Sequence, residues 1–447
     1  MNIRKFTASI LACTVIGAAV PFAQTASPQL SITASASEEY TEGTYELMTY
    51  KNYGSYIEIA DCDTSVTAVD IPASIDGLPV TSVGKEAFSH CLYLTSVVIP
   101  DSITSIGSHA FYNCESLTNI TLPDSVSSIG ACAFYYCESL KSIKLPNGIT
   151  AISNSMFKEC TSLSSIVIPD SVTSTGESSF MGCDVLTSIE FPEGFTTIGR
   201  FSFCGCERLT SAELPDTLTS IGDAGFASCY SLKSISLPDS VSSMGDSVFT
   251  NCFDLESAEL PDTLSSIGLK VFNGCESLTN ITIPASVTSI GKDAFRNTSV
   301  LEGITILNPD CEIYDSFATI TNAYSDAYPD SDDRTDYYYN GIIFGYSGST
   351  AQEYAEKYGY KFAALDMMGK NIGDINSDGA INALDASLVL TEYAANSTGQ
   401  ASTLDDIAKS NADVNSDGAI NALDASYILS YYAYTATGGT GSILEFI

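Results

Sequence analysis

The sequence predicts an α+β protein, in which a long solenoid of 23-residue repeats is followed by a small all-α module. Two observations predict this class. Dipeptides of an apolar residue and a proline recur every 23 residues from Ile99 to Pro284, and one twelve-residue run occurs twice, at residues 376–387 and 415–426. Repeats of about 20 to 50 residues are typical of solenoids, because each unit buries its apolar positions only against its neighbours.

The first 36 residues predict a secretory signal. Arg4 and Lys5 precede an apolar run over residues 6–20, and small residues follow that would allow cleavage between residues 23 and 36. The run is too short for a stable membrane span. We therefore expect a secreted, extracellular protein that has no membrane attachment after signal cleavage.

Residues 37–70 are expected to cap the solenoid at its N-terminal end, because apolar and polar residues alternate there as in a strand. The solenoid itself is expected over residues 71–307. A C-terminal cap follows over residues 308–366, with a short helix at residues 351–358 and an acidic, solvated loop at residues 326–336.

One repeat reads Cys-x-x-Leu-x-x-Ile-x-Leu-Pro-Asp-Ser-Val-x-x-Ile-Gly-x-x-Ala-Phe, which is leucine-rich-repeat spacing. The unit resembles the BspA-like class of bacterial surface leucine-rich repeats. In a representative unit Ile120 and Leu122 would point inward, so Asn119 and Thr121 would face outward. The column of Thr121 varies from unit to unit, which indicates either a surface that recognises an extracellular protein or glycan, or an exposed position under no selection. The charged members of this column, our candidates for recognition, are Lys144, Glu190, Glu213 and Glu259.

Nine cysteines occupy a single column of the repeat. In an exported chain such a series suggests disulfides, but side chains in register on stacked strands lie about 4.8 Å apart, whereas the Cβ atoms of a disulfide prefer about 3.8 Å. We therefore expect buried, reduced thiols. The column comprises Cys91, Cys114, Cys137, Cys160, Cys183, Cys206, Cys229, Cys252 and Cys275. Cys62, Cys132, Cys204 and Cys311 lie off the column and are better candidates for pairing.

The duplicated run predicts two calcium sites. With the acid before it, each copy reads Asp-x-Asn-x-Asp-Gly-x5-Asp. A calcium ion takes about six to eight oxygen ligands, and a twelve-residue loop supplies them from positions 1, 3, 5, 7, 9 and 12. Gly379 and Gly418 allow the sharp turn at position 6. Turn-forming residues could produce one such run by chance, but not two identical copies. The expected ligands are Asp374, Asn376, Asp378, the carbonyl of Ala380, Asn382 and Asp385 for one ion, and Asp413, Asn415, Asp417, the carbonyl of Ala419, Asn421 and Asp424 for the other.

Each loop is followed by an apolar, helix-like stretch, at residues 386–393 and 425–432, whereas the residues before Asp374 start no helix. A duplicated EF-hand-like half-motif with only an exiting helix resembles a type I dockerin. The resemblance covers residues 371–435, followed by a tail over residues 436–447. It implies calcium-dependent binding to a cohesin domain, which would attach the chain to a cellulosome-like scaffold.

In that family, loop positions 10 and 11 and residues along the exiting helix face the cohesin. The residues at these positions are Ala383, Leu384, Leu390, Thr391 and Glu392 in the first copy, and Ala422, Leu423, Ser430 and Tyr431 in the second. Leu384 and Leu423 could instead pack within the module, because leucine is most often buried. The helix positions differ between the copies, which weakens the idea of two equivalent binding orientations.

The chain carries 18 basic and 54 acidic residues, a formal charge of −36. This charge repels phosphate, so we expect neither a nucleic acid nor an anionic membrane surface as partner. The only histidines, His90 and His109, lie in variable columns, and the recurrent aspartates that follow each repeat proline are turn residues. The sequence contains no tryptophan to form a sugar-stacking cleft, although it has 25 tyrosines.

Two functions therefore remain open. The favoured one is a secreted, non-catalytic binding protein whose repeats bind a protein or glycan while the dockerin holds it on a scaffold. The alternative is an enzyme or accessory factor of extracellular polysaccharide degradation. That alternative rests only on the association of dockerins with such enzymes.

Overall fold

The computed structural model describes residues 39–322, 339–365, 372–376, 378–404, 406–415, 417–439 and 443–446. The predicted signal and the predicted acidic loop at residues 326–336 lie outside this part of the chain. Within it, no helix is long and apolar enough to cross a membrane. The solenoid and the helical module have separate hydrophobic cores.

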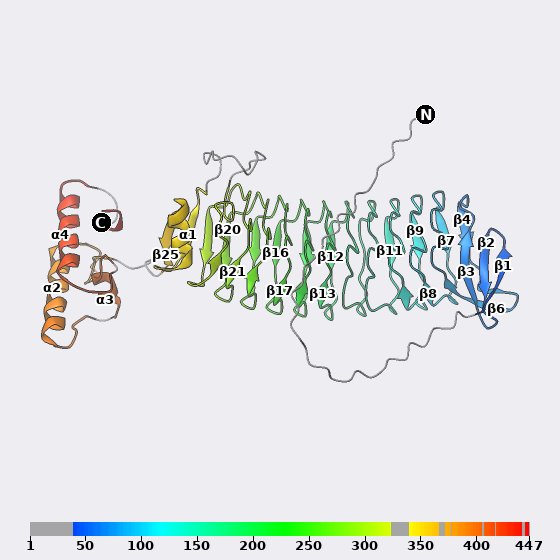
Figure 1. The fold of residues 1–447 in the computed structure, drawn as a ribbon, viewed down its shortest axis with the longest axis horizontal. Coiled ribbons are helices and arrows are strands. Elements are labelled where there is room, and N and C mark those ends of the chain that lie inside the picture. The colour runs from blue at the N-terminus through cyan, green and yellow to red at the C-terminus, as the bar shows by residue number, and fades with distance from the viewer. Residues whose placement is uncertain are drawn as a thin grey trace, which may run out of the picture. The chain divides into compact units, whose positions relative to one another are not determined.

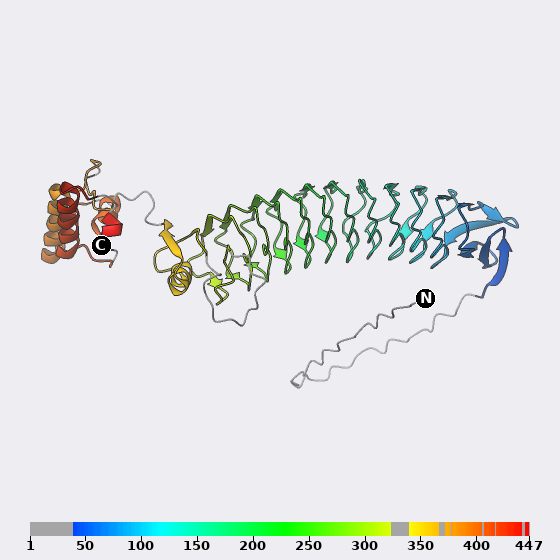
Figure 2. The ribbon, with the colours of Figure 1, turned by 90° about the horizontal axis from the view of Figure 1, so that it is seen from above.

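The solenoid consists of stacked coils that contribute short parallel strands to two rows (Figure 1, Figure 2). Successive strands pair in register one repeat apart, so that Asn119 lies opposite Ser142. The first strand row comprises β4 (Ala68–Asp70), β7 (Ser96–Val98), β9 (Asn119–Thr121), β11 (Ser142–Lys144), β12 (Ser188–Glu190), β14 (Ser211–Glu213), β16 (Ser234–Ser236), β18 (Ser257–Glu259), β20 (Asn280–Ile283), β22 (Gly303–Ile306), β24 (Ile342–Gly345) and β25 (Lys361–Ala364). The second strand row comprises β6 (Leu78–Val83), β8 (Ser105–Ile106), β10 (Ser128–Ile129), β13 (Thr197–Ile198), β15 (Ser220–Ile221), β17 (Ser243–Met244), β19 (Ser266–Ile267), β21 (Ser289–Ile290) and β23 (Glu312–Ile313).

A column of phenylalanines runs through the solenoid core. Neighbouring rings are stacked, with centroids 5.2 to 5.9 Å apart. Each ring between the two ends of the column stacks on rings of both neighbouring coils, so no single coil could bury it alone. The column comprises Phe88, Phe111, Phe134, Phe157, Phe180, Phe203, Phe226, Phe249, Phe272 and Phe295, all fully buried.

The cysteine column is buried beside these rings, and its nine thiols are unpaired, as predicted. The Sγ of Cys114 donates to the carbonyl of Phe88 at 3.1 Å, and the equivalent contact recurs in the later coils. Burial raises the pKa of the Cys137 and Cys252 thiols to about 12. The pairing considered for cysteines outside the column is not present, because every cysteine in the described part of the chain is free.

Both ends of the solenoid are covered by other elements. At the N-terminal end β1 (Thr41–Tyr45), β2 (Met48–Asn52) and β3 (Ile57–Cys62) pair antiparallel, and β3 joins the second row by pairing in parallel with β6. The short β5 (Ser74–Ile75) pairs with β6. At the other end lies α1 (Thr350–Tyr358), close to the predicted residues 351–358.

The helical module contains α2 (Ala383–Thr398), α3 (Asp406–Ala412), α4 (Ala422–Ala436) and α5 (Ile443–Phe446). The two loop-following helices were predicted, whereas α3 was not. Residues 436–447 were predicted to form a tail outside the module. However, Ile443 is 3% exposed and belongs to the module core. The ring of Phe446 contacts Tyr434 and Tyr431, with centroids 5.1 and 5.8 Å apart. The helical unit therefore extends beyond residue 435.

Candidate functional site

The first predicted calcium loop is organised by its two terminal aspartates. The carboxylate of Asp374 accepts hydrogen bonds from the backbone N–H groups of Asp378 and Gly379, at 3.1 and 2.9 Å. Asp385 accepts from the N–H groups of Ile375 and Asn382, at 2.8 and 2.9 Å. Gly379 has a positive φ of 85°, as a sharp turn at position 6 requires. The loop thus folds back on itself between these two carboxylates.

In the middle of this loop, the side chains and backbone groups that carry the other predicted ligand oxygens are joined by hydrogen bonds. The amide of Asn376 donates to Asp378 at 2.8 Å, and the amide of Asn382 donates to the carbonyl of Ala380 at 3.0 Å. The backbone N–H of Ala380 donates to the other oxygen of Asp378 at 2.9 Å. All six predicted ligand residues of the loop therefore belong to one hydrogen-bonded turn.

The second loop has the same geometry. Asp413 accepts from Asp417 and Gly418 at 3.1 and 3.0 Å, and Asp424 accepts from Val414 and Asn421 at 2.8 and 2.9 Å. The predicted residues in the middle of the loop, Asn415, Asp417, Ala419 and Asn421, repeat the contacts of the first copy. The duplicated sequence therefore produces two equivalent sites.

Each loop leads directly into its helix through a capping box. Asn382 is the N-cap residue of α2, and its side chain accepts from the N–H of Leu384 at 2.8 Å. Asp385, three residues on, bonds back to the N–H of Asn382. Asn421 and Asp424 make the same box at the start of α4. The carboxylates at loop position 12 are thereby fixed beside the positive ends of two helices.

These carboxylates fit a cation site. Asp385 and Asp424 are both 0% exposed, and neither makes an ion pair with another described residue. A buried charge without a counter-charge is costly, and a bound cation would offset that cost. Among the described residues, no three His, Cys, Asp or Glu side chains form a metal site by themselves. The predicted donor set adds amide and carbonyl oxygens to the carboxylates, and such an all-oxygen set suits calcium.

Most of the predicted cohesin contacts are exposed. Leu384 and Leu423 are 54% and 46% exposed, so the alternative that they pack within the module is wrong. Leu390 is 44% exposed, and the half-buried Tyr431 lies against Phe446. The remaining small or polar candidates, Ala383, Thr391, Ala422 and Ser430, are exposed as well.

Glu392 is the exception, and its prediction as a cohesin contact is wrong. The side chain is 1% exposed, and Oε2 accepts a hydrogen bond from the N–H of Thr403 at 3.0 Å. Hydrogen bonds from the Ser402 side chain and from Thr403 lower the pKa of Glu392. This carboxylate holds the segment before α3 against α2, a role that sequence spacing did not reveal because α3 was not predicted.

Several exposed apolar side chains of the helical module were missed by the sequence reasoning. Tyr393, Leu429 and Tyr432 are 44%, 43% and 44% exposed. Tyr393 and Tyr432 occupy equivalent positions of the two copies, as do Leu390 and Leu429. Because the same residue types recur at equivalent positions of the two copies, the duplication of the sequence could have identified these exposed side chains.

On the solenoid, the outward column of the first strand row lies where it was predicted. In β9 Ile120 is buried, while Asn119 and Thr121 are exposed. In the same column, the Lys144 ammonium lies 3.7 Å from the carboxylate of Asp124, and the Ser236 hydroxyl donates to Glu259 at 2.7 Å.

Glu190 and Glu213 lie directly opposite each other on β12 and β14. Like charges in register on neighbouring strands disfavour the pairing of those strands. The exposed carboxylates of Glu190 and Glu213 therefore weaken the pairing of β12 with β14 slightly.

The two histidines lie in an aromatic cluster. The ring centroids of His90 and His109 lie 5.1 and 5.6 Å from that of Tyr112, in edge-on contacts. His90 Nδ1 also lies 3.2 Å from the side-chain amide of Asn113. His90 is exposed and His109 is half-buried.

Comparison with known families identifies both parts of the chain. The family model described as BspA type leucine-rich-repeat region matches residues 81–209 and 196–318, which together make up more than half of the chain. The chain belongs to this family. The model of the dockerin type I domain matches residues 372–431. The protein is therefore a BspA-type leucine-rich-repeat solenoid with a C-terminal type I dockerin, a calcium-dependent, cohesin-binding module.

Solved structures of leucine-rich proteins from bacteria are among those that resemble the chain. A leucine-rich cell surface protein from Faecalibacterium prausnitzii shares 27% identity over 65% of this chain and 100% of its own, with a TM-score of 0.41. The T. pallidum leucine-rich-repeat protein shares 31% identity over 48% of this chain and 91% of its own, with a TM-score of 0.40. A Bacteroides ovatus protein shares 24% identity over 74% of this chain and 100% of its own, at 0.42. Comparison with curated proteins found no match.

Proposed function

We propose that the protein is a secreted, non-catalytic binding protein. In this proposal its dockerin attaches it to a cohesin of a cellulosome-like scaffold, and its repeats bind an extracellular protein or glycan. The observation that carries the proposal is the pair of equivalent loops, each closed by a fully buried aspartate at the start of a helix. A module built in this way depends on a bound cation and suits regulated attachment better than catalysis.

We assign one calcium ion to each loop. In the first loop the ligands are the oxygens of Asp374, Asn376, Asp378, Asn382 and Asp385 with the carbonyl of Ala380, and the second loop uses the equivalent residues. The formal charge of −36 for the whole chain also favours binding of a dication.

The cohesin contact is assigned to the exposed residues at the starts and along the outer surfaces of α2 and α4. Each helix presents two leucines and a tyrosine of matching exposure, and these form the apolar sets of the two copies. Because the two apolar sets match, they favour two orientations of the dockerin on the cohesin. The second orientation puts α4 in the place that α2 takes in the first. Thr391 and Ser430, which differ between the copies, would make those orientations slightly unequal. The sets are Leu384, Leu390 and Tyr393 on α2, and Leu423, Leu429 and Tyr432 on α4.

The assignment is tested by calorimetric titration of the intact chain with a panel of type I cohesin domains in calcium. Binding should disappear on chelation and in Asp374→Ala with Asp413→Ala. A matched control, Asp124→Ala with Asp170→Ala in solenoid turns, removes the same charge and should bind normally. Undiminished binding in excess chelator would refute the calcium-dependent dockerin assignment.

The two orientations are tested with leucine variants. Leu384→Ala alone and Leu423→Ala alone should each leave one orientation intact and weaken cohesin binding only a few-fold. The double variant should weaken it at least about 100-fold, because both orientations lose a central apolar contact. If one single variant alone abolishes binding, only one orientation is used.

The alternative of an enzyme or accessory factor in polysaccharide degradation has a separate test. The purified chain should release no reducing sugar from plant polysaccharides. Turnover that a single carboxylate substitution abolishes would overturn the non-catalytic proposal, since a glycosidase needs a specific carboxylate pair.

A further inference from the structure

Two buried thiols meet at the N-terminal end of the solenoid. Cys62, the last residue of β3, is 4% exposed, and Cys91, the first cysteine of the column, is 0% exposed. A hydrogen bond joins their side chains. Cys91 Sγ also lies 3.9 Å from the carbonyl oxygen of Asp63, the residue that follows Cys62. One cysteine of the cap and one of the first coil of the column therefore lie together in the apolar core.

The later thiols of the cysteine column are held differently. Each donates to the carbonyl of a phenylalanine in the coil before it, at 3.1 to 3.3 Å. The phenylalanine column begins at Phe88, in the same coil as Cys91, so the coil before it offers no such carbonyl. The contact of Cys91 with Asp63 is longer than all of the others. The backbone therefore holds the Cys91 thiol less firmly, which leaves its sulfur available to Cys62.

Cys62 also lies outside the register that keeps the column thiols apart. β4 and β7 pair with Ala68 opposite Ser96. The same offset sets Cys91 opposite Asp63, one residue beyond Cys62. Asp63 is exposed and Cys62 is buried, so the side chain that points inward is the one out of register. The spacing of about 4.8 Å between side chains in register, which disfavours disulfides within the column, does not apply to this pair.

The hydrogen bond makes one of the two sulfurs the better nucleophile. It lowers the pKa of the Cys91 thiol, whereas the same hydrogen bond, together with burial, raises the pKa of Cys62. In the next two coils, burial raises the pKa of Cys114 and Cys137. Thiol–disulfide exchange begins with attack by a thiolate. Cys91 is therefore the first nucleophile of the pair.

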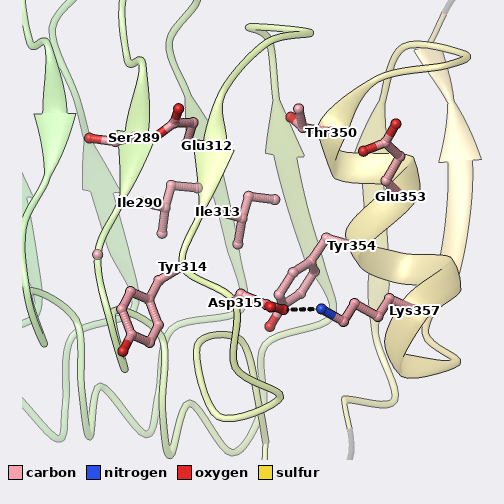
Figure 3. A pocket seen from close by; sticks show the side chains of 11 residues that line it. Ser289, Ile290, Glu312, Ile313, Tyr314, Asp315, Thr350, Glu353, Tyr354 and Lys357 are labelled. Carbon is pink, nitrogen blue, oxygen red and sulfur yellow. Dashed lines mark hydrogen bonds and ion pairs between the residues drawn. The ribbon is translucent and has the colours of Figure 1, made fainter.

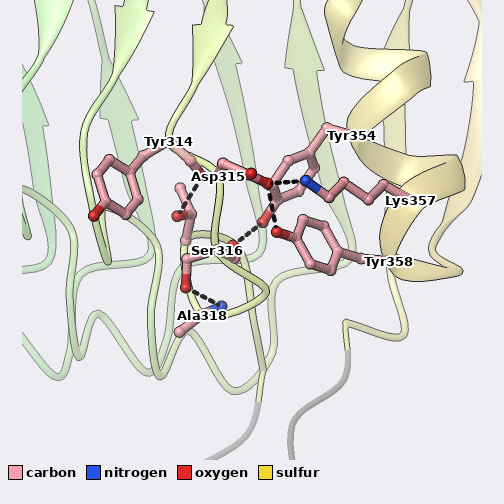
Figure 4. Close-up of polar contacts among 8 residues, drawn as sticks. Tyr314, Asp315, Ser316, Ala318, Tyr354, Lys357 and Tyr358 are labelled. Atoms are coloured by element: carbon pink, nitrogen blue, oxygen red, sulfur yellow. Dashed lines mark hydrogen bonds and ion pairs between the residues drawn. The ribbon is translucent and has the colours of Figure 1, made fainter.

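The C-terminal end of the solenoid is closed in another way. There α1 packs against β23, as Figure 3 shows. Lys357 of this helix forms an ion pair with Asp315, and the Tyr358 hydroxyl donates to the same carboxylate at 2.7 Å (Figure 4). Cys311 is buried at this end, and burial raises its pKa to about 11. Polar contacts from a helix hold this end, whereas the N-terminal cap is joined to the coils through the pairing of β3 with β6 and through the two thiols.

We propose that Cys62 and Cys91 form a modification site, at which a disulfide fastens the N-terminal cap to the solenoid. The structure shows both thiols reduced, and the oxidant is a small-molecule disulfide of the oxidising environment outside the cell. An end coil has a neighbour on one side only, so the cap opens more easily than the middle coils. The disulfide closes residues 62–91 into a loop and restricts that opening. This inference rests on the proposed secretion of the chain, but not on its cohesin or its repeat ligand.

The reaction consists of two exchange steps. The Cys91 thiolate attacks one sulfur of the small disulfide, and the other half leaves as a thiolate. Cys62 then loses its proton and attacks the Cys91 sulfur, which releases the second half. The two cysteines lose two electrons and two protons, and the reagent takes them up to become two thiols. Because Cys91 is fully buried, the exchange takes place while the cap is open, before the chain has finished folding.

The test refolds the intact, reduced chain in calcium with excess oxidised glutathione and compares it with the chain refolded in a reductant. The oxidised chain should lose two of the thiols that titrate in denaturant. Trypsin should release residues 52–85 linked to residues 86–141, and fragmentation in a mass spectrometer should place the bond between Cys62 and Cys91. Hydrogen–deuterium exchange in β1, β2 and β3 should slow at least about ten-fold on oxidation and recover when reductant is added.

Two variants complete the test. Cys62→Ala should keep all of its thiols in oxidised glutathione. The matched control, Cys311→Ala, removes a buried thiol from the other end and should lose two thiols as the unaltered chain does. Peptide mapping of the unaltered chain gives the answer even if Cys62→Ala does not fold.

Three results would overturn the proposal. They are a refolded chain that keeps every thiol, a disulfide between any other two cysteines, and equal exchange of the cap in the two redox forms. Residues 372–447 contain no cysteine, so cohesin binding by the same two samples tests the proposed function separately.

Discussion

The solenoid and the dockerin are both built from repeats but are stabilised in different ways. In the solenoid, each coil stacks a phenylalanine, a cysteine and several aliphatic side chains on those of the next coil, so the core is continuous and apolar. In the described part of the dockerin, the core contains nine buried apolar residues, while Asp385 and Asp424 are buried in the loops. Hydrophobic burial is sufficient to specify the first structure, whereas the second also requires compensation of buried charge.

This difference assigns separate tasks to the two parts. A core that depends mainly on apolar packing gives a surface that does not depend on calcium, which suits the binding role that we propose for the repeats. A core with buried carboxylates responds to calcium concentration, as conditional attachment requires. The predictions that follow test this separation, from the largest effect to the smallest.

The largest effect is expected from the loop substitutions Asp374→Ala with Asp413→Ala. They remove position 1 of both loops, so calcium should no longer stabilise the dockerin. We expect loss of the dockerin unfolding transition in calorimetry and a fall in helical circular dichroism, with the solenoid transition unchanged. The Asp124→Ala, Asp170→Ala control should leave both transitions in place, and a shift of the solenoid transition in the loop variant would contradict the separation.

The next effect is expected from Phe180→Ala, in the middle of the phenylalanine column. The ring is fully buried between Phe157 and Phe203. Its loss should lower the free energy of unfolding of the solenoid by about 3 to 5 kcal/mol, measured by denaturant titration. Tyr93→Ala, which truncates a side chain that is 63% exposed, serves as the control and should change it little. The dockerin transition should not move in either variant.

The buried thiols predict that the solenoid loses stability in alkali. Burial raises the pKa of Cys252 from 9.0 to about 12, so the folded state keeps its proton where the unfolded state releases it. This contribution is intact below pH 9 and falls as the pH rises toward 12. At pH 10 the loss amounts to about 1.4 kcal/mol for one thiol. Cys252→Ala should therefore flatten the alkaline fall in the free energy of unfolding.

The native thiols should also resist a thiol reagent at pH 8 and react fully on unfolding. Rapid reaction of the column cysteines in the native chain would show that the coils are open. Cys132, which is only partly buried, serves as the internal reference for an accessible thiol.

The smallest effect is expected for Glu392→Gln in the dockerin. Its pKa is lowered from the usual 4.5 by hydrogen bonds from Ser402 and Thr403. The ionised form therefore stabilises the fold at neutral pH, and this stability is lost as the pH falls below about 4.5. The variant should lower the dockerin melting temperature modestly at pH 7 and reduce its dependence on acid pH. Thr391→Ala, an exposed neighbour, should do neither.

Sequence periodicity predicted the parts of the fold that repeat. The register of Asn119, Ile120 and Thr121 followed from the alternation of a strand. The helices after the loops followed from the apolar stretches at residues 386–393 and 425–432. The second strand row was not predicted, because its strands are only two residues long in most coils. Helix α3 and the burial of Ile443 were missed for a related reason, since both depend on contacts between segments distant in sequence.

The candidate sites show the same limit. The loop residues were predicted together because all the ligands of a site lie within twelve consecutive residues. Glu392 was misassigned because its partners, Ser402 and Thr403, lie beyond the helix and become neighbours only in the folded module.

Hydrogen–deuterium exchange of the intact chain, with and without calcium, tests the separation of the two parts most directly. We predict that chelation speeds amide exchange in α2 and α4 at least about ten-fold and leaves the coils of the phenylalanine column unchanged. Faster exchange in the solenoid, or equal protection of α2 and α4 with and without calcium, would contradict the account.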